Sequence, residues 1–468
     1  ARARDYAPAA LNTLLRGSVP SGVAFVTSAQ TLASSSCSSR VELEARDVYG
    51  NPTIFPTSRN VQLAGTGLTF FSDPGCTSPL SNLTFNTGAG RVAFHFKVRG
   101  ENTYRLSATV PGMNPARQDV LVLQAVRANI CEMPADARSV TCQVSPPQVD
   151  LAKTALFFQT SPGGRSPDSG SLRCMLTARD AITCGRNEVG SDTVYIAWRT
   201  LELGSLRVQH FQPECRGGNT IQTPILPVAA DKSFVLVSGE QAGKILGEDD
   251  LFTAKLTPEG DRVDVQFSVP CGGWKGSLQV VEAEGIRVNR GTGAMGGGQT
   301  GASSVGQPSV DLTSSVLLFT HRVSNAGVPS VCDRVLRGSL ASSTEVAFSR
   351  GVDSSSGCAT AVIDEIAWER IDFGALARVQ SLNVSMDRRQ YEATTRLSTP
   401  VDDRRTLMFA SGQVLNGQAG GESTYSGDDI IGESLTTFEF RSSTELYHVR
   451  DSAEGRARWS GYAVQFEP

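Results

Sequence analysis

The cysteines are the residues of this sequence whose number and spacing point most directly to chemistry. There are ten of them, none in a CxxC pair, and the four histidines are scattered along the chain. Zinc sites need cysteine and histidine pairs at short spacing, so the pattern predicts no metal site. An even number of separated cysteines favours disulfides instead. Pairing each cysteine with its neighbour, which is one of hundreds of possible connectivities, predicts the bridges Cys37–Cys76, Cys131–Cys142, Cys174–Cys184, Cys215–Cys271 and Cys332–Cys358.

Disulfides require an oxidising compartment, so the sequence predicts a secreted or cell-surface protein. The alternative is a cytosolic protein with buried free thiols. No apolar run approaches the length of a membrane-spanning helix, so no transmembrane segment is predicted. The chain opens with ARARDYAPAALNTLLRGS, which has neither an initiator Met nor a signal-type apolar core. A processed mature N-terminus is the expectation, although a trimmed chain would look identical.

Acidic pairs and a glycine-rich segment are the remaining candidates for chemistry. Neighbouring acids on a turn do not converge across a cleft, as the two carboxylates of a glycosidase must. We interpret them as solvated turns, with Ca²⁺ binding as the alternative. The glycine-rich segment 293–306 lacks the GK[ST] ending of a phosphate loop. The sequence therefore predicts no catalytic residue, no cofactor and no enzyme; the acidic pairs are Asp249–Asp250, Asp402–Asp403 and Asp428–Asp429.

The elements that position these residues are predicted to be β-strands throughout. A chain of 468 residues is too long for one core and indicates several domains. Its net charge of −4 gives no basic field for nucleic acid. After an arm of residues 1–18, residues 19–124 form short alternating segments separated by turn residues, which predicts one β-sandwich. In RVAFHFKV, Phe94 and Phe96 share one face, so His95 is expected on the solvent face.

One motif in this first domain is similar to a known family. A strand before a cysteine, a turn of the form D-x-x-G-N-P and the run F-x-S-D-x-x-C follow one another. The domain thereby resembles the bacterial Ig-like domains of myxobacterial-type secreted and surface proteins. The resemblance implies a spacer or stalk without catalytic residues, and it supports the Cys37–Cys76 bridge. The matching residues are Asp47, Gly50, Asn51, Pro52, Phe71, Asp73 and Cys76.

The rest of the chain is predicted to repeat one β-unit four times. The stretch GEDDLFTAKLT at 247–257 returns as SGDDIIGESLT at 426–436. Four segments share a layout of an apolar strand (ALFF, FVLV, VLLF or LMFA), a loop, a strand ending on leucine and a third strand. The fold class is thus all-β: an Ig-like domain, then four related β-units of no named family, with pairing of the units into larger sandwiches left open. The expected boundaries are 125–137 for a linker or hairpin and 138–216, 217–299, 300–386 and 387–468 for the repeats, with marker leucines Leu176, Leu256, Leu340 and Leu435.

The expected exposure of the tryptophan side chains indicates whether the protein has a sugar-binding surface. Trp198 and Trp368 lie in alternating strands and are expected in the core. Trp274 lies in the turn CGGWKGS and is expected to be exposed, while Trp459 near the C-terminal strand suits either role. Exposure of Trp274 or Trp459 would offer a platform for stacking on a sugar ring and would favour a carbohydrate-binding module.

The function predicted first is a non-catalytic structural subunit of an extracellular filament, pilus-like fibre or cell-surface assembly. If the arm completed a sheet in the next subunit, the head-to-tail contacts would not close and a filament would grow. The alternative is that the arm packs on its own chain. Two other functions stay open: an adhesin that binds cell-surface polysaccharide, and a polysaccharide lyase or hydrolase. The residues of the arm expected to contact the next subunit are Tyr6, Ala9, Leu11, Leu14 and Leu15. Separately, a Cys215–Cys271 bridge is expected to lock the first two repeats together.

Overall fold

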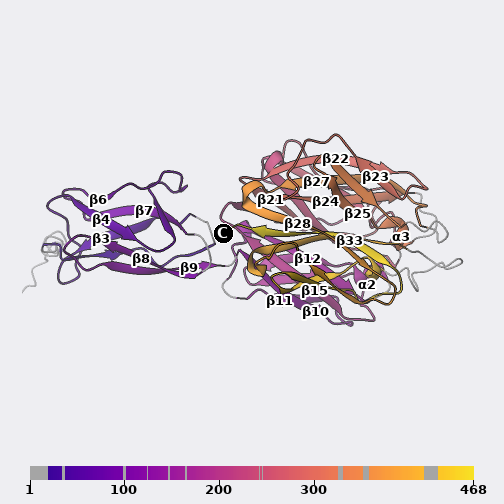
Figure 1. Ribbon diagram of the computed structural model, residues 1–468, viewed down its shortest axis with the longest axis horizontal. Coiled ribbons are helices and arrows are strands. Elements are labelled where there is room, and N and C mark those ends of the chain that lie inside the picture. The colour runs from indigo at the N-terminus through magenta and orange to yellow at the C-terminus, as the bar shows by residue number, and fades with distance from the viewer. Residues whose placement is uncertain are drawn as a thin grey trace, which may run out of the picture. The chain divides into compact units, whose positions relative to one another are not determined.

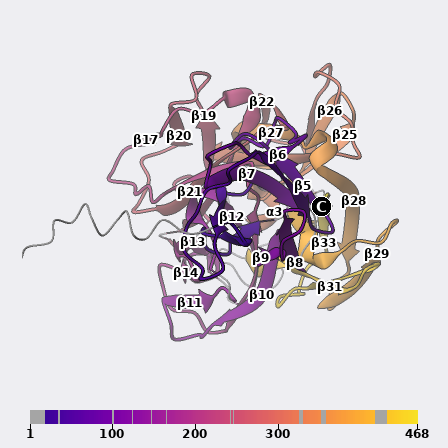
Figure 2. The ribbon, with the colours of Figure 1, turned by 90° about the vertical axis from the view of Figure 1, so that its left-hand side faces the viewer.

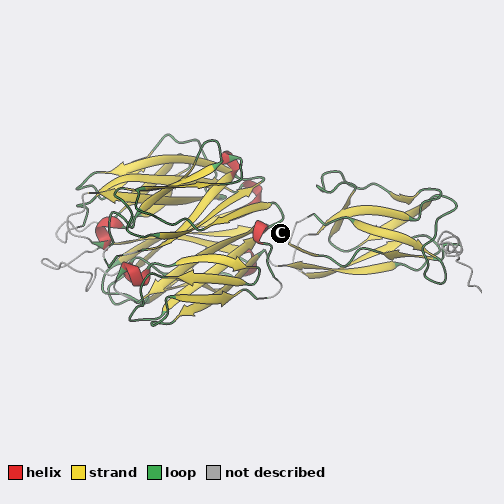
Figure 3. Ribbon diagram, turned by 180° about the vertical axis from the view of Figure 1, so that it is seen from behind, coloured by secondary structure: helices red, strands yellow, loops and turns green. Residues whose placement is uncertain are grey.

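The chain folds almost entirely into β-strands, as the sequence predicts. In the computed structural model 55% of the chain is strand and 6% is helix, and the helices are short pieces at the ends of strands (Figure 3). No helix in the described part of the chain is long and apolar enough to cross a membrane. The structure describes residues 19–33, 37–98, 102–123, 125–145, 148–163, 166–241, 243–244, 246–324, 330–351, 358–415 and 431–467.

The chain divides into two compact units, one up to residue 124 and one over residues 125–467. The first unit is a two-sheet sandwich whose inward-facing aliphatic and aromatic side chains form one core. One sheet has the order β1(Gly22–Phe25)-β3(Val41–Arg46)-β7(Arg91–Val98)-β5(Leu68–Phe71). The other has the order β2(Thr31–Ala33)-β9(Ala116–Leu123)-β8(Asn102–Thr109)-β4(Arg59–Ala64)-β6(Leu83–Phe85).

His95 on β7 is buried rather than solvent-facing, so that expectation is wrong. The segment around Cys37, which the Cys37–Cys76 disulfide links to Cys76, pairs with β7 through a bridge between Cys37 and Lys97. The Nδ1 atom of His95 lies 3.0 Å from the carbonyl oxygen of Ser38 on that segment. Period-2 alternation placed the side chain on the correct face but could not show that a loop covers it.

The second of these compact units, residues 125–467, contains one six-stranded β-unit repeated four times. The four copies are called units one to four below. Each β-unit forms two three-stranded antiparallel sheets: an inner sheet in the order first-sixth-third strand and an outer sheet in the order second-fifth-fourth. Unit one has β10(Val126–Met133), β11(Ser139–Gln143), β12(Thr154–Pro162), β13(Arg173–Ala178), β14(Ala181–Gly185) and β15(Val194–Glu202). Unit two has β16(Leu206–Phe211), β17(Thr220–Pro224), β18(Ser233–Glu240), β19(Phe252–Leu256), β20(Arg262–Phe267) and β21(Lys275–Ala283).

Units three and four repeat the same order of strands. Unit three has β22(Arg287–Met295), β23(Gly301–Ser304), β24(Ser315–Ser324), β25(Arg337–Ser342), β26(Glu345–Ser349) and β27(Val362–Asp372). Unit four has β28(Ala377–Met386), β29(Glu392–Arg396), β30(Thr406–Val414), β31(Thr437–Ser442), β32(Glu445–Val449) and β33(Ala457–Phe466). The connecting helical turns are η1(Leu151–Lys153), α2(Pro167–Gly170), η2(Ala230–Lys232), α3(Val331–Arg334), η4(Gly374–Leu376), η5(Asp403–Arg405) and η6(Ile431–Glu433).

The predicted boundaries divide these units at the wrong strand. Residues 125–137, expected as a linker or hairpin, contain β10, and the strand expected to end each of the first three repeats is the first strand of the next unit. The first strand pairs with the sixth strand of its own unit, far along the chain, so spacing alone did not reveal its sheet. As a result Cys215 and Cys271 both lie in unit two, and their disulfide does not join two repeats.

The similar stretches 247–257 and 426–436 do not occupy equivalent positions in their two units. The strand registers pair Leu176, Leu256 and Leu340 with Ile182, Val263 and Val346, and the equivalent pair in unit four is Phe440 with Leu446. Leu435 comes just before β31, so it is not the fourth marker. The number of repeats is correct, and the apolar strands ALFF, FVLV, VLLF and LMFA are the equivalent third strands β12, β18, β24 and β30.

The four units are arranged around a shared interior rather than in pairs. The outer sheets point in four different directions (Figure 2), and in Figure 1 the third strands β12 and β24 lie nearer the middle than β10 and β22, the first strands of the same inner sheets. One hydrophobic cluster includes side chains from all four inner sheets, among them Phe157, Phe234, Val316 and Phe409. Units one, two and four each add a smaller core between their own two sheets. The shared cluster places the four third strands around one axis.

Candidate functional site

The third strands of the four units present equivalent residues to the axis. Each of these strands begins with a buried hydroxyl residue, at Thr154, Ser233, Ser315 and Thr406. In every unit the fourth and fifth residues of this strand are apolar and the sixth is polar. The equivalent triplets are Phe157-Phe158-Gln159, Leu236-Val237-Ser238, Leu318-Phe319-Thr320 and Phe409-Ala410-Ser411.

All residues of these triplets except Thr320 line a cavity of about 270 Å³, which we call the axial cavity. A second cavity of about 390 Å³, which we call the mouth, adjoins it, and Gln159, Ser238, Ala410 and Ser411 line both. The lining of the axial cavity has no charged side chain, and in the lining of the mouth the charged residue is Asp250. The axial cavity is therefore an uncharged hollow, the mouth has one carboxylate in its lining, and polar side chains lie where the two parts meet.

A polar side chain at one equivalent position of each sixth strand joins each unit to the previous one. Gln279 in β21 uses both ends of its amide on the backbone of Leu156 in unit one, with its oxygen accepting from the N–H at 2.8 Å and its Nε2 donating to the carbonyl at 2.8 Å. Glu369 in β27 accepts from the N–H of Val235 in unit two at 2.9 Å. These bonds satisfy backbone groups that would otherwise be buried without partners.

The same position closes the ring between units three, four and one. The hydroxyl of Tyr462 in β33 accepts from the N–H of Leu340 at 3.0 Å. Arg199 in β15 donates to the carbonyl of Thr406 at 3.2 Å and so connects unit one to unit four. Burial lowers the pKa of Arg199 to about 10 and raises the pKa of Tyr462 to about 12. Both groups keep their ordinary protonation state at neutral pH and act as fixed hydrogen-bond partners.

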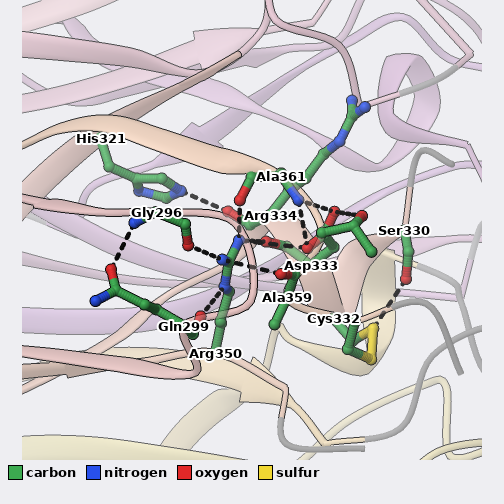
Figure 4. Close-up of polar contacts among 12 residues, drawn as sticks. Gly296, Gln299, His321, Ser330, Cys332, Asp333, Arg334, Arg350, Ala359 and Ala361 are labelled. Carbon is green, nitrogen blue, oxygen red and sulfur yellow. Dashed lines mark hydrogen bonds and ion pairs between the residues drawn. A yellow bond between two sulfur atoms is a disulfide. The ribbon is translucent and has the colours of Figure 1, made fainter. Parts of the chain in front are cut away.

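A buried arginine holds the turns together inside three of the four units. In unit three Arg350, which directly follows β26, donates to the carbonyls of Gly296 at 3.0 Å and Gln299 at 2.8 Å, which lie in the connection between the first two strands (Figure 4). It also pairs with the carboxylate of Asp333 in α3 at 3.3 Å. Burial lowers the pKa of the Arg350 guanidinium, and the Asp333 carboxylate opposes that shift.

Units four and one have an equivalent arginine that bonds to the same connections, so we call Arg186, Arg350 and Arg450 the clamp arginines. Arg450 donates to the carbonyls of Asp387 and Gln390 and pairs with the Glu433 carboxylate at 3.0 Å. Burial raises the pKa of Glu433, and its bonds to Ser452 and Arg450 oppose that rise. Arg186 donates to carbonyls at 2.7 to 3.1 Å in the first connection of unit one and in α2, which are those of Pro134, Ala135, Ala137 and Ser169.

Unit two has a disulfide where the other units have the clamp arginine. The strand registers place Phe267 at the arginine position. The Cys215–Cys271 disulfide links the connection after β16 to the connection after β20, which are the two connections that the arginine joins elsewhere. Sequence reasoning missed this substitution, although the strings CGR, FSR and HVR at the ends of the fifth strands carried a signal for the arginines.

The prediction of a sugar-binding platform at Trp274 or Trp459 is wrong, because each of these side chains is only 1% exposed. Trp274 packs edge-on against Phe252 and Phe267, over the space that Gly239 and Gly276 leave free of side chain. Trp459 lies over Gly412 and donates its indole N–H to the carbonyl of Ser434 at 2.8 Å. The glycine-rich turn indicated exposure, but the glycines in fact admit the indole into the core. Trp198 and Trp368 are buried as expected.

The structure contains the five nearest-neighbour disulfides. Asp402 caps η5 by accepting from the N–H of Arg404 at 3.2 Å, and Asp250 is buried in the mouth. No cluster of three His, Cys, Asp or Glu side chains suited to a metal ion occurs among the residues that the structure describes. Asp428–Asp429 and the arm residues Tyr6, Ala9, Leu11, Leu14 and Leu15 lie outside the described residues.

The histidines contact structural partners and lie in different parts of the fold. His95 contacts a backbone carbonyl in the first sandwich, as do His210 in unit two and His321 in unit three. His448 in unit four contacts the hydroxyl of Thr395 at 2.8 Å. Within the described part of the chain, none of these contacts links a nucleophile to a carboxylate through a histidine, which is the arrangement that hydrolysis by a catalytic triad requires.

Neither a protein-family model nor a curated protein matches this sequence. Among solved structures, domains 4 and 5 of the S-layer protein SbsC align with 22% of this chain at 16% identity and a TM-score of 0.16, so the chain spans about half (52%) of that structure. Domains 4–9 of SbsC align with 84% of this chain and 72% of that one, at 10% identity and a TM-score of 0.17. The N-terminal eight Ig domains of Down Syndrome Cell Adhesion Molecule align with 93% of this chain and 57% of that one, at 9% identity and a TM-score of 0.14. These TM-scores are too low to transfer properties to this chain.

Proposed function

We propose that this chain is a non-catalytic structural subunit of an extracellular or cell-surface assembly. The observation that carries the proposal is the use of its interior polar groups. Arg199, Gln279, Glu369 and Tyr462 hold the four units in a ring, and the clamp arginines hold the turns within three of them. Groups fixed in such bonds are not free to move protons or attack a substrate, since catalysis needs a group within reach of the reacting atoms. The hydrogen bonds and ion pairs of the described interior therefore favour a rigid structural role.

The disulfides support the extracellular location. Each of the five bridges lies within one β-unit or within the first sandwich, so none depends on an assembly partner. Such bridges persist in oxidising compartments and restrict the unfolded chain. A subunit exposed outside the cell gains resistance to unfolding from them.

We further propose that subunits associate through the N-terminal arm. Its apolar residues Tyr6, Leu11, Leu14 and Leu15 suit a strand that completes a sheet in a neighbouring subunit. Edge strands such as β17 and β29 have free backbone groups along one side of the outer sheets, which is the surface that strand addition needs. Head-to-tail donation of this kind produces an open filament.

Negative-stain electron microscopy of the purified protein tests this proposal. We expect filaments or chains of particles from the full chain and dispersed particles after deletion of residues 1–18. The triple variant L11S/L14S/L15S should behave like the deletion, while the matched arm variant N12A/T13A should still assemble. Dispersed particles from the full chain at every concentration, or assembly that survives the deletion, would overturn the role of the arm.

The carbohydrate-binding alternative is not retained on its original residues. It required Trp274 or Trp459 as an exposed platform, and the structure buries both. No other residue that the sequence singled out for sugar binding remains.

A further inference from the structure

The axial cavity exposes apolar side chains in the interior of the protein. Phe158, Leu236, Leu318 and Phe319 lie on the central strands and pack against the neighbouring cores, but they are only partly buried and also border the hollow. Protein interiors are normally close-packed, and a hollow of this size lined by aromatic and aliphatic groups is a favourable place for an apolar molecule. This feature adds nothing to the rigidity proposed above and calls for a separate explanation.

The charge of the lining restricts what can enter. No Asp, Glu, Lys or Arg lines the axial cavity, and the carboxylate of Asp250 lies in the lining of the mouth. Within the axial cavity an ionised group would lose its hydration without gaining a partner of opposite charge, which is strongly unfavourable. An anion would in addition meet the Asp250 carboxylate. The cavity therefore selects for uncharged molecules.

One polar group at the junction of the two cavities lacks a partner. The Nε2 of Gln159 is buried and has no hydrogen-bond partner in the structure, whereas the hydroxyl of Ser411 at the equivalent position accepts from the N–H of Gly338 at 3.0 Å. Thr320, also equivalent, accepts from the N–H of Ala254 at 2.9 Å. A buried donor without a partner is unfavourable, and a ligand oxygen placed there would remove the penalty.

We propose that the axial cavity and its mouth bind one uncharged molecule that has an aliphatic body and a hydrogen-bond-accepting oxygen, the class represented by acyl esters and fatty alcohols. The aliphatic body lies among Phe158, Leu236, Leu318 and Phe319. The oxygen accepts from the Nε2 of Gln159, where the two cavities meet. This proposal does not depend on assembly through the arm, because every residue it uses belongs to a single chain.

Fluorescence of N-phenyl-1-naphthylamine, an uncharged apolar probe, tests binding to the full chain. We expect probe fluorescence to rise on binding and octyl acetate to displace the probe. Octanoate, which has a similar aliphatic body and a negative charge, should compete at least about tenfold more weakly, since its charge must be desolvated without a cationic partner. Equal competition by octyl acetate and octanoate would overturn the proposal, and so would the absence of any binding, which would mean that the cavity holds water only.

Two variants locate the binding in this cavity. A410F projects a ring into both cavities from an exposed position on β30 and should abolish probe binding, while A294F on an exposed position of β22 is the matched control and should not. Q159L keeps the size of the side chain and removes the donor. It should weaken octyl acetate by about three- to tenfold, the effect of one neutral hydrogen bond, and leave the probe unchanged. If A410F fails to fold, Q159L still decides: an unchanged affinity for octyl acetate would contradict the role of Gln159.

Discussion

Arg199 donates a hydrogen bond of 3.2 Å to the carbonyl of Thr406, a residue 207 positions further along the chain. This contact joins the first β-unit to the fourth and closes the ring around the axial cavity. Its guanidinium also lies over the ring of Phe440 in unit four, with 4.9 Å between the guanidinium carbon and the ring centroid. The other three junctions join neighbours in sequence, so this junction is the one through which distant segments close the fold.

Removing the closing contact should destabilise the ring. We expect R199M to lower the free energy of unfolding by about 1–3 kcal/mol, since hydrogen bonds from a charged donor contribute about this much. Urea denaturation followed by intrinsic tryptophan fluorescence measures the change. R207M is the control, because Arg207 makes its contacts at the exposed surface of unit two. Equal losses in both variants would contradict the role of Arg199 in closure.

The clamp in unit four should behave as a coupled buried pair. R450M removes the partner of the fully buried Glu433 carboxylate and should cost about 3–5 kcal/mol. The double variant R450M/E433Q should lose less than the sum of the two single variants, because it leaves no unpaired charge. Arg456 and Asp387, an exposed pair, should show a coupling of only about 0.2–1 kcal/mol in the same double-mutant cycle. Additive losses in the buried cycle would argue against a clamp.

The disulfide that replaces the clamp in unit two should contribute more than a short bridge elsewhere. Cys215–Cys271 spans 56 residues and Cys174–Cys184 spans 10. The loop-entropy relation gives about 4 kcal/mol for the longer loop and about 3 kcal/mol for the shorter one. C215S/C271S should therefore lower the thermal midpoint more than C174S/C184S, as calorimetry of both double variants would show. The reverse order would mean that unit two does not rely on its bridge as a clamp.

Two buried histidines should make stability fall in acid. Burial lowers the pKa of His321 to about 4 and the pKa of His448 to about 4, from an ordinary value near 6.5. Between pH 6.5 and 4 the unfolded chain binds more protons at these sites than the folded chain, so stability is present above this window and is lost as the pH falls through it. Each group accounts for up to about 3 kcal/mol of this loss.

The variant H448Q isolates one of these two contributions. Urea midpoints measured at pH 7.5 and pH 4.5 should differ less for H448Q than for the parent chain, because glutamine has no proton to gain in this range. Comparison of the two proteins cancels the contributions of the other ionisable groups, including that of Glu433. An unchanged pH dependence in H448Q would show that the pKa of His448 is the same in the folded and the unfolded state.

Local patterns were enough to predict the elements and their chemistry. Alternation over residues such as those of β7 and β12 indicated strands, and the even number of separated cysteines indicated disulfides, because both depend on residues that are close in sequence. The same local signals failed where a distant segment decided the outcome. His95 is covered by the loop of Cys37, and Trp274 occupies space left by Gly239 and Gly276.

The sequence by itself determined an all-β chain with a first sandwich, four copies of one unit and cysteines in an even number that indicates disulfides, with nearest-neighbour pairing as one of many possible connectivities. Only the tertiary structure decided where each unit begins, that the four units close into a ring and that their third strands enclose a cavity. The physical reason is that these features depend on pairing between strands and side chains far apart in sequence. The first strand of each unit pairs with the sixth, and Arg199 meets Thr406 only when all four units are in place.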